Sequence, residues 1–241
     1  MPLSKPRRRF VSVAALVLGG SLQRTFSAPR LLVVLDLDET LLHATLCKVD
    51  EDLSWLPARV WQPRVDFEAK GKGLVLGLDE EIPLFVSLRP GAEEFLEWLK
   101  SADVDVAVYT AGTEPYAKQS VVKLALDKYP SLFRDECVPF GLPITKDLTK
   151  LREDLSRVVL VDNSRRSFWL QPDNGLLVSD WDGRNSSDEE LKAVKATLLE
   201  LLQLEDVRPH LRSRLPQEAS VDVRLFAAAA ILLTALPVLN P

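Results

Sequence analysis

The chain has 241 residues, of which 46% are hydrophobic and 27% charged. That length can bury one good hydrophobic core, so we expect one domain rather than two. The formal net charge of −5 argues against direct nucleic-acid binding, which normally requires a basic surface. Cys47 and Cys137 are too few for a disulfide scaffold or a tetrahedral zinc site, so we expect reduced and mainly structural thiols.

Residues 1–30 form a basic N-terminal segment around an apolar run from Phe10 to Leu18, with no acidic side chain. As a helix, this run together with its flanking glycines is about 16 Å long, too short for a hydrocarbon core of ~30 Å. The pattern is typical of a signal peptide or an organelle transit peptide, and a disordered or membrane-touching arm is the alternative. We therefore expect an organelle or endomembrane location if the segment is a leader, and otherwise the cytoplasm or nucleus.

A near-continuous apolar run follows from Leu31 to Leu35 and predicts a central strand that is buried on both faces of a parallel sheet. Asp36 and Asp38 come directly after it, at the end of the strand where α/β sheets bind ligands, with Leu37 facing the opposite way. Two such close carboxylates need a positive partner, and Mg2+ is the hard cation that fits oxygen ligands. A solvated strand-to-loop turn is the alternative explanation.

Residues 41–88 are predicted to be a β insertion. Its second half indicates a three-stranded meander, with strands at 64–69, 74–78 and 84–88 and a turn at 70–73. Trp55 and Trp61 either pack this insertion onto the main domain or line a peptide groove.

From Arg89 onward the pattern alternates between helices and strands. Helices are expected from Arg89-Pro90-Gly91 onward, over 114–128 and over 188–204, and strands over 104–109, 158–163 and 176–178. Thr110 follows one strand, and Asp162 and Asn163 end another. Because carboxyl ends of parallel strands share one edge of the sheet, we expect these polar side chains to meet.

The main domain is expected to cover 31–215, and an apolar tail covers 216–241. The run from Leu225 to Leu239 carries no charge and is about 22 Å long if helical, which is short for a span of ~30 Å. A helix packed on the domain and a tail anchor both remain open, so membrane contact through the N-terminal leader or the C-terminal tail is an open expectation.

Four motifs resemble those of the haloacid dehalogenase (HAD) superfamily, and specifically its CTD-type small phosphatases, the RNA polymerase II C-terminal-domain phosphatases and Dullard-like proteins. They are D-L-D-E-T-L-L-H at 36–43, Y-T-A-G at 109–112, K-D-L at 146–148 and V-V-L-V-D-N at 158–163. The resemblance implies a HAD-like α/β fold, a doubly wound parallel sheet with a small antiparallel β insertion after the first strand. Three departures are Gly112 in place of serine, Pro139-Phe140-Gly141 in place of His-x-Gly, and Arg165 in place of proline.

The same resemblance implies an Mg2+-dependent protein serine/threonine phosphatase that acts on a phosphorylated protein or peptide. Asp36 is then the nucleophile, Asp38 the general acid and base, and Thr110 and Lys146 hold the phosphoryl group. Asp36, Asp38 and Asn163 are the implied metal ligands, and Asp162 is either a further ligand or the group that orients Lys146.

Two alternatives follow from the same superfamily. One is a catalytically idle binding module that resembles the presequence receptor of the mitochondrial inner-membrane translocase. That receptor's domain has typically lost the two aspartates, whereas Asp36 and Asp38 are both present here. The other is a small-metabolite phosphatase, against which the β insertion and the K-D-L motif argue.

Overall fold

The computed structural model describes residues 29–45, 65–72, 81–139 and 144–215. The N-terminal leader, Cys47, Trp55, Trp61, the strand expected at 74–78 and the tail at 216–241 lie outside these ranges. In the described part, no helix has both the length and the apolar character that crossing a bilayer requires.

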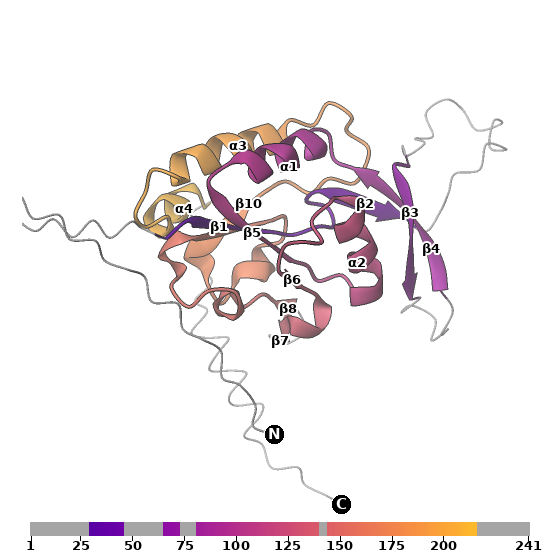
Figure 1. The fold of residues 1–241 in the computed structure, drawn as a ribbon, viewed down its shortest axis with the longest axis horizontal. Coiled ribbons are helices and arrows are strands. Elements are labelled where there is room, and N and C mark those ends of the chain that lie inside the picture. Colours follow the sequence, from indigo (N-terminus) through magenta and orange to yellow (C-terminus); the bar gives the residue numbers. More distant parts are fainter. Residues whose placement is uncertain (1–28, 46–64, 73–80, 140–143, 216–241) are drawn as a thin grey trace, which may run out of the picture.

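A five-stranded parallel sheet forms the centre of the molecule, in the order β10-β9-β1-β5-β6 (Figure 1). Its strands are β1 (Leu31–Leu35), β5 (Val104–Tyr109), β6 (Ser131–Leu132), β9 (Val158–Asp162) and β10 (Gly175–Leu177). All five β1 residues are buried, as its unbroken apolar run predicts for a strand covered on both faces. The predicted parallel α/β fold is therefore confirmed, with β1 as the middle strand.

The two faces of the sheet are covered differently. On one face, Leu31, Val33 and Leu35 belong to the larger hydrophobic core, which the helices complete. These helices are α1 (Ala92–Ser101), α2 (Glu114–Lys123), α3 (Glu190–Leu201) and α4 (Arg208–Arg214), with α1 and α3 side by side in Figure 1. On the other face, Leu32 and Val34 pack with residues from short 3-10 turns. These turns include η3 (Leu148–Lys150), η4 (Leu155–Arg157), η5 (Arg165–Phe168) and η6 (Pro172–Asn174).

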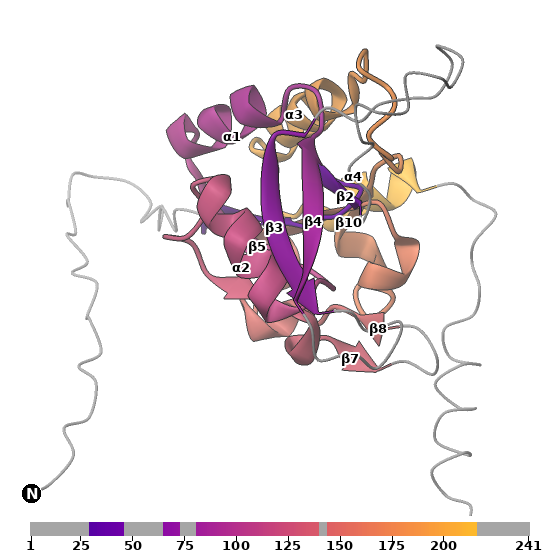
Figure 2. The same cartoon turned by 90° about the vertical axis from the view of Figure 1, so that its right-hand side faces the viewer.

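A second sheet with three antiparallel strands lies beside the carboxyl end of β1. Its order is β2-β4-β3, with β2 (Leu42–Thr45), β4 (Glu81–Leu88) and β3 (Phe67–Lys72). Figure 2 shows β3 and β4 running side by side. The small antiparallel insertion after the first strand is thus confirmed.

The turn expected at 70–73 is wrong, because Lys70, Gly71 and Lys72 continue β3 and pair with β4. Gly71 lies so close to Leu84 that an added Cβ would be 2.7 Å from Leu84 Cδ1. The glycine therefore serves a close packing contact within the hairpin rather than a turn.

Several helix ends differ from the predicted ones. The first helix begins at Ala92, after Gly91 adopts a left-handed φ of 79°. The second ends at Lys123 instead of 128, because Ala125 has a φ of 53° and the Leu126 amide bonds back to Val121. The remaining segments are η2 (Arg134–Glu136) and a small hairpin of β7 (Val138–Pro139) and β8 (Ile144–Thr145).

Candidate active site

All six predicted site residues line a single polar cavity of about 590 Å³ at the carboxyl edge of the parallel sheet. They are Asp36, Asp38, Thr110, Lys146, Asp162 and Asn163. Strands β1, β5 and β9 are neighbours in the sheet, so the residues that end or follow them are brought together although they are far apart in the sequence.

The loop after β1 directs both aspartates to the cavity. Leu37 is fully buried in the core, and its carbonyl accepts hydrogen bonds from the amides of Thr40, Leu41 and Leu42 at 2.8–3.2 Å. Glu39 completes this tight turn with a φ of 58°, a conformation that is unfavourable for a residue other than glycine. Asp36 and Asp38 then lie on the side opposite Leu37, as predicted from the alternation of side chains.

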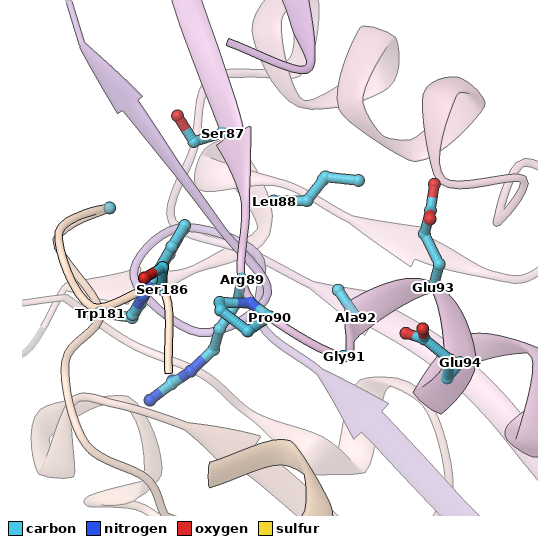
Figure 3. A pocket seen from close by; sticks show the side chains of 11 residues that line it. Ser87, Leu88, Arg89, Pro90, Gly91, Ala92, Glu93, Glu94, Trp181 and Ser186 are labelled. Atoms are coloured by element: carbon cyan, nitrogen blue, oxygen red, sulfur yellow. The ribbon is translucent and has the colours of Figure 1, made fainter. Parts of the chain in front are cut away.

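Arg89 stabilises this strained loop through hydrogen bonds to its backbone. Its buried guanidinium donates hydrogen bonds to the carbonyls of Glu39 and Thr40, at 3.4 and 3.2 Å. It also donates to the Ser179 carbonyl and hydroxyl at 2.9 Å and to the Asp188 carboxylate at 2.7 and 3.0 Å. Figure 3 shows Arg89 between the start of α1 and the loop that carries Trp181, beside a separate cavity of about 230 Å³. This arginine therefore joins the loop after β1 to the segment that follows β10.

Lys146 is buried between two carboxylates. Its Nζ donates to Asp36 Oδ1 and to Asp162 Oδ2, both at 2.6 Å. Burial alone would lower the pKa of Lys146, but Asp162 and Asp36 outweigh this effect and raise it, so the ammonium stays charged. Burial raises the pKa of Asp36 to about 8, although the attraction of Lys146 opposes that shift. Lys146 therefore favours the ionised form of Asp36.

Asp162 uses both of its oxygens within the protein. Oδ2 accepts from Lys146, and Oδ1 accepts from the backbone amide of Ser164 at 2.7 Å. Of the two roles considered for Asp162, this arrangement favours the orientation of Lys146 over metal ligation.

Asp38 is half-buried in the same cavity and accepts a short hydrogen bond from the hydroxyl of Tyr116 on α2. Burial raises the pKa of Asp38, and the bond from Tyr116 partly offsets the rise. A carboxyl group with a raised pKa keeps its proton at higher pH, which suits a general acid.

Thr40 connects Asp36 to Asn163. Its hydroxyl lies 3.1 Å from Asp36 Oδ2 and 3.3 Å from Asn163 Oδ1. The same hydroxyl oxygen accepts a hydrogen bond from the backbone amide of Asn163 at 3.2 Å. The side-chain nitrogen of Asn163 donates to Asp180 at 2.7 Å, which turns the Asn163 oxygen towards Thr40. An amide oxygen and a carboxylate are thereby held on the two sides of one hydroxyl.

The donor set fits Mg2+. The expected ligands are the Asp36 carboxylate, the Asn163 amide oxygen and the Asp38 backbone carbonyl, all hard oxygen donors, and Mg2+ usually keeps several waters beside few protein ligands. Within the described ranges, no three or more His, Cys, Asp or Glu side chains are grouped to hold a metal ion. A site with a single carboxylate ligand is compatible with that finding.

Thr110 is fully buried at the end of β5, and its oxygen accepts a hydrogen bond from the Gly112 amide at 2.9 Å. The hydroxyl hydrogen remains available to a ligand in the cavity. Cys137 is also buried, where its thiol contacts the carbonyls of Thr110 and Phe133 and where burial raises its pKa. A thiol with a raised pKa is a poor nucleophile, which agrees with a structural role.

Sequence reasoning did not single out four residues at the site: Thr40, Tyr116, Arg134 and Arg166. Only Thr40 had a usable signal, because it closes the motif that begins at Asp36. The other three come from α2, η2 and η5, and Arg134 and Arg166 line the cavity. Their contribution depends on packing between distant segments.

Residues 31–208 match the family model described as NLI interacting factor-like phosphatase. The chain belongs to this family. It is 35% identical over 192 residues to CTD small phosphatase-like protein 2 of Dictyostelium discoideum, which covers 78% of this chain and 30% of that protein. It is 31% identical over 191 residues to the human carboxy-terminal domain RNA polymerase II polypeptide A small phosphatase 1. That match covers 78% of this chain and 65% of the human protein.

The mitochondrial import inner membrane translocase subunit TIM50 of Candida glabrata is also similar. It is 35% identical over 132 residues, which cover 52% of this chain and 26% of that protein. The similarity therefore extends both to relatives named phosphatases and to a relative named as a translocase subunit, and the chain spans less than two thirds of each.

Proposed function

We propose that the chain is an Mg2+-dependent protein serine/threonine phosphatase that forms an aspartyl-phosphate on Asp36. The observation that carries the proposal is the buried Lys146, which pairs with Asp36 and Asp162 in one cavity with Asp38. A positive charge fixed beside a carboxylate supports attack on a phosphoryl group, whose oxygens it also attracts. Membership of a phosphatase family supports the same conclusion.

In the first step, Asp36 attacks the phosphorus of a phosphoserine or phosphothreonine. The bond between phosphorus and the ester oxygen breaks, and Asp38 gives its proton to the departing hydroxyl. In the second step, Asp38 takes a proton from water, which attacks the phosphorus and releases inorganic phosphate and free Asp36. Lys146 and Thr110 hold phosphoryl oxygens in both steps. Bound Mg2+ would supply further neutralisation of the phosphoryl charge.

A protein or peptide substrate is favoured over a metabolite. The cavity is open and polar, and two of the similar proteins are named CTD small phosphatases. A catalytically idle binding module remains the rival proposal because of the similarity to a translocase subunit. The two proposals differ in one measurable respect, since only the phosphatase turns over a phosphorylated substrate.

The test is Mg2+-dependent turnover of a panel of phosphopeptides beside phosphorylated metabolites, followed by two substitutions with different expected effects. Asp36→Asn removes the nucleophile, so turnover falls to background. Asp38→Asn leaves Asp36 able to attack, but it removes the acid for an alkoxide leaving group and the base for water. With nitrophenyl phosphate, whose leaving group hardly needs a proton, this variant should accumulate a protein heavier by one phosphoryl group.

Mass spectrometry of the quenched Asp38→Asn reaction locates that phosphoryl group, which hydroxylamine should remove as it removes an acyl phosphate. A phosphoryl group on a cysteine or a histidine would contradict the assignment, and so would an Asp36→Asn protein that still turns over. An intact protein without turnover of any substrate would favour the binding module.

A further inference from the structure

Arg166 is an exposed cation in the wall of the active-site cavity. Its side chain has no hydrogen-bond or ion-pair partner among residues 29–45, 65–72, 81–139 and 144–215. By contrast, Lys146 in the same cavity is paired with two carboxylates at 2.6 Å. The charge of Arg166 is therefore not neutralised by the described part of the chain and is open to an anion in the cavity.

The topology places Arg166 on the β9 side of the nucleophile. It belongs to η5, which follows β9, whereas Arg134 begins η2 on the opposite side, where its amide bonds to the Gly112 carbonyl at 3.0 Å. Because β1 lies between β9 and β5, η5 and η2 follow strands on opposite sides of β1, after which Asp36 comes. Neighbouring strands lie ~4.8 Å apart, so an anion beside Arg166 is displaced from the attack position at Asp36.

The acid nearest along the chain on this side does not compete for Arg166. Both oxygens of Asp162 are engaged, one with Lys146 and one with the Ser164 amide. Asn163, the next residue, is neutral and bonds to Asp180. An incoming anionic group would thus meet a guanidinium that has no partner in the described ranges, and its planar fork matches both phosphate and carboxylate.

We propose that Arg166 binds a second anionic group of the substrate, so that the enzyme prefers peptides with another phosphate or carboxylate close to the target phosphoresidue. The proposal rests on the proposed function. Side chains two residues apart in an extended peptide are ~7 Å from each other on the same face, so a second anion at such a spacing lies outside the attack position. Arg166 then determines substrate specificity without taking part in bond breaking.

Binding can be tested independently of turnover. Two sets of three fluorescent peptides carry the same non-hydrolysable phosphonate analogue of phosphoserine. One set varies the residue two positions before the analogue, and the other varies the residue two positions after it. In each set the varied position holds alanine, glutamate or a second phosphonate. Fluorescence anisotropy with the full chain should give an affinity about fivefold higher for the doubly anionic peptides than for the alanine peptide, as expected for one exposed charged pair. The glutamate and phosphonate peptides show which anion is preferred.

Arg165→Ala is the matched control for Arg166→Ala, because it removes the same charge one residue away from a side chain that does not line the cavity. The preference for the second anion should disappear in Arg166→Ala, reverse in Arg166→Glu and persist in Arg165→Ala. It should also shrink with added salt. Equal losses in the Arg165 and Arg166 variants, or no preference in the unmodified protein, would overturn the proposal.

The matching phosphoserine peptides test the proposed function separately. Turnover of the singly phosphorylated peptide supports the phosphatase, whatever the affinity ratio. If the preference depends on Arg166 but no phosphoserine peptide is turned over, the anion-site proposal stands and the proposed phosphatase function is rejected.

Discussion

Replacing Arg89 tests what holds the loop after β1 in place. In Arg89→Met, an apolar side chain of similar length fills the space but leaves the carboxylate of Asp188 and several carbonyls without their donor. The side chain of Arg89 is 0% exposed and that of Asp188 is 11% exposed, so water replaces little of what is lost. Removing one partner of a buried ion pair costs about 3–5 kcal/mol. We expect that loss in the free energy of unfolding, against a total of about 5–15 kcal/mol for a domain.

Urea unfolding of the full chain, followed by tryptophan fluorescence and circular dichroism, measures this loss. Arg184→Met is the control, because Arg184 and Asp182 form a pair whose side chains are 70% and 58% exposed. Pairs of that kind contribute about 0–1 kcal/mol. If Arg89→Met loses no more than Arg184→Met, then the network around Arg89 does not stabilise the loop and our reasoning is wrong.

The pH dependence of the same loss identifies the contribution of Asp188. Burial alone would raise the pKa of Asp188, but the hydrogen bonds from Arg89 and from the Glu190 backbone amide, together with the charge of Arg89, outweigh this effect and lower it. A lowered carboxyl pKa stabilises the fold above the unfolded-state pKa of about 3.9, and this stabilisation is lost as the pH falls through the folded-state pKa. The difference in the free energy of unfolding between wild type and Arg89→Met should therefore be largest at neutral pH and decrease below about pH 4. A difference that stays constant with pH would exclude Asp188 as its source.

Two further predictions concern the chemistry. EDTA should abolish turnover and Mg2+ should restore it, and undiminished turnover in EDTA would rule out the metal site. In a titration of activity with Mg2+, Asn163→Ala should need at least about tenfold more metal than the unmodified protein. Tyr116→Phe removes the donor to Asp38, so kcat for a phosphoserine peptide should fall about tenfold and kcat for nitrophenyl phosphate should fall less. Equal losses on both substrates would show that Tyr116 does not act through Asp38.

The strands that carry the site were predictable because their sequence leaves few alternatives. An apolar run such as Leu31–Leu35, with no alternation, suits a strand that is covered on both faces, and β1 and β5 have the predicted bounds. Parallel strands also bring their carboxyl ends to one edge, so residues that follow different strands had to meet. This is why the sequence alone placed Asp36, Thr110 and Asp162 at one edge of the sheet, where they line one cavity.

The rest of the site depends on contacts that no local pattern records. Tyr116 lies on α2 with ordinary helical spacing, and only the packing of that helix brings its hydroxyl to Asp38. Arg166 follows Asn163 in a short 3-10 turn whose direction is set by the hydrophobic burial of Phe168. Likewise, the pairing of β3 with β4 overrides the turn tendency of Lys70 and Gly71. Tertiary packing decides each of these positions.

The pairing of Lys146 connects the stability of the site with its chemistry. Three buried side chains, Asp36, Lys146 and Asp162, carry a net charge of −1 when all are ionised, and burying such a group is costly unless each member is paired. Asp162 offsets part of that cost because its carboxylate is a second partner for the Lys146 ammonium. The Ser164 backbone amide in turn holds the other oxygen of Asp162. Lys146 is then held at 2.6 Å from Asp36, where its charge opposes the rise that burial causes in the pKa of Asp36. A nucleophilic carboxylate must be ionised to attack, so the ion pair with Lys146 favours the reactive form of Asp36 against the effect of burial.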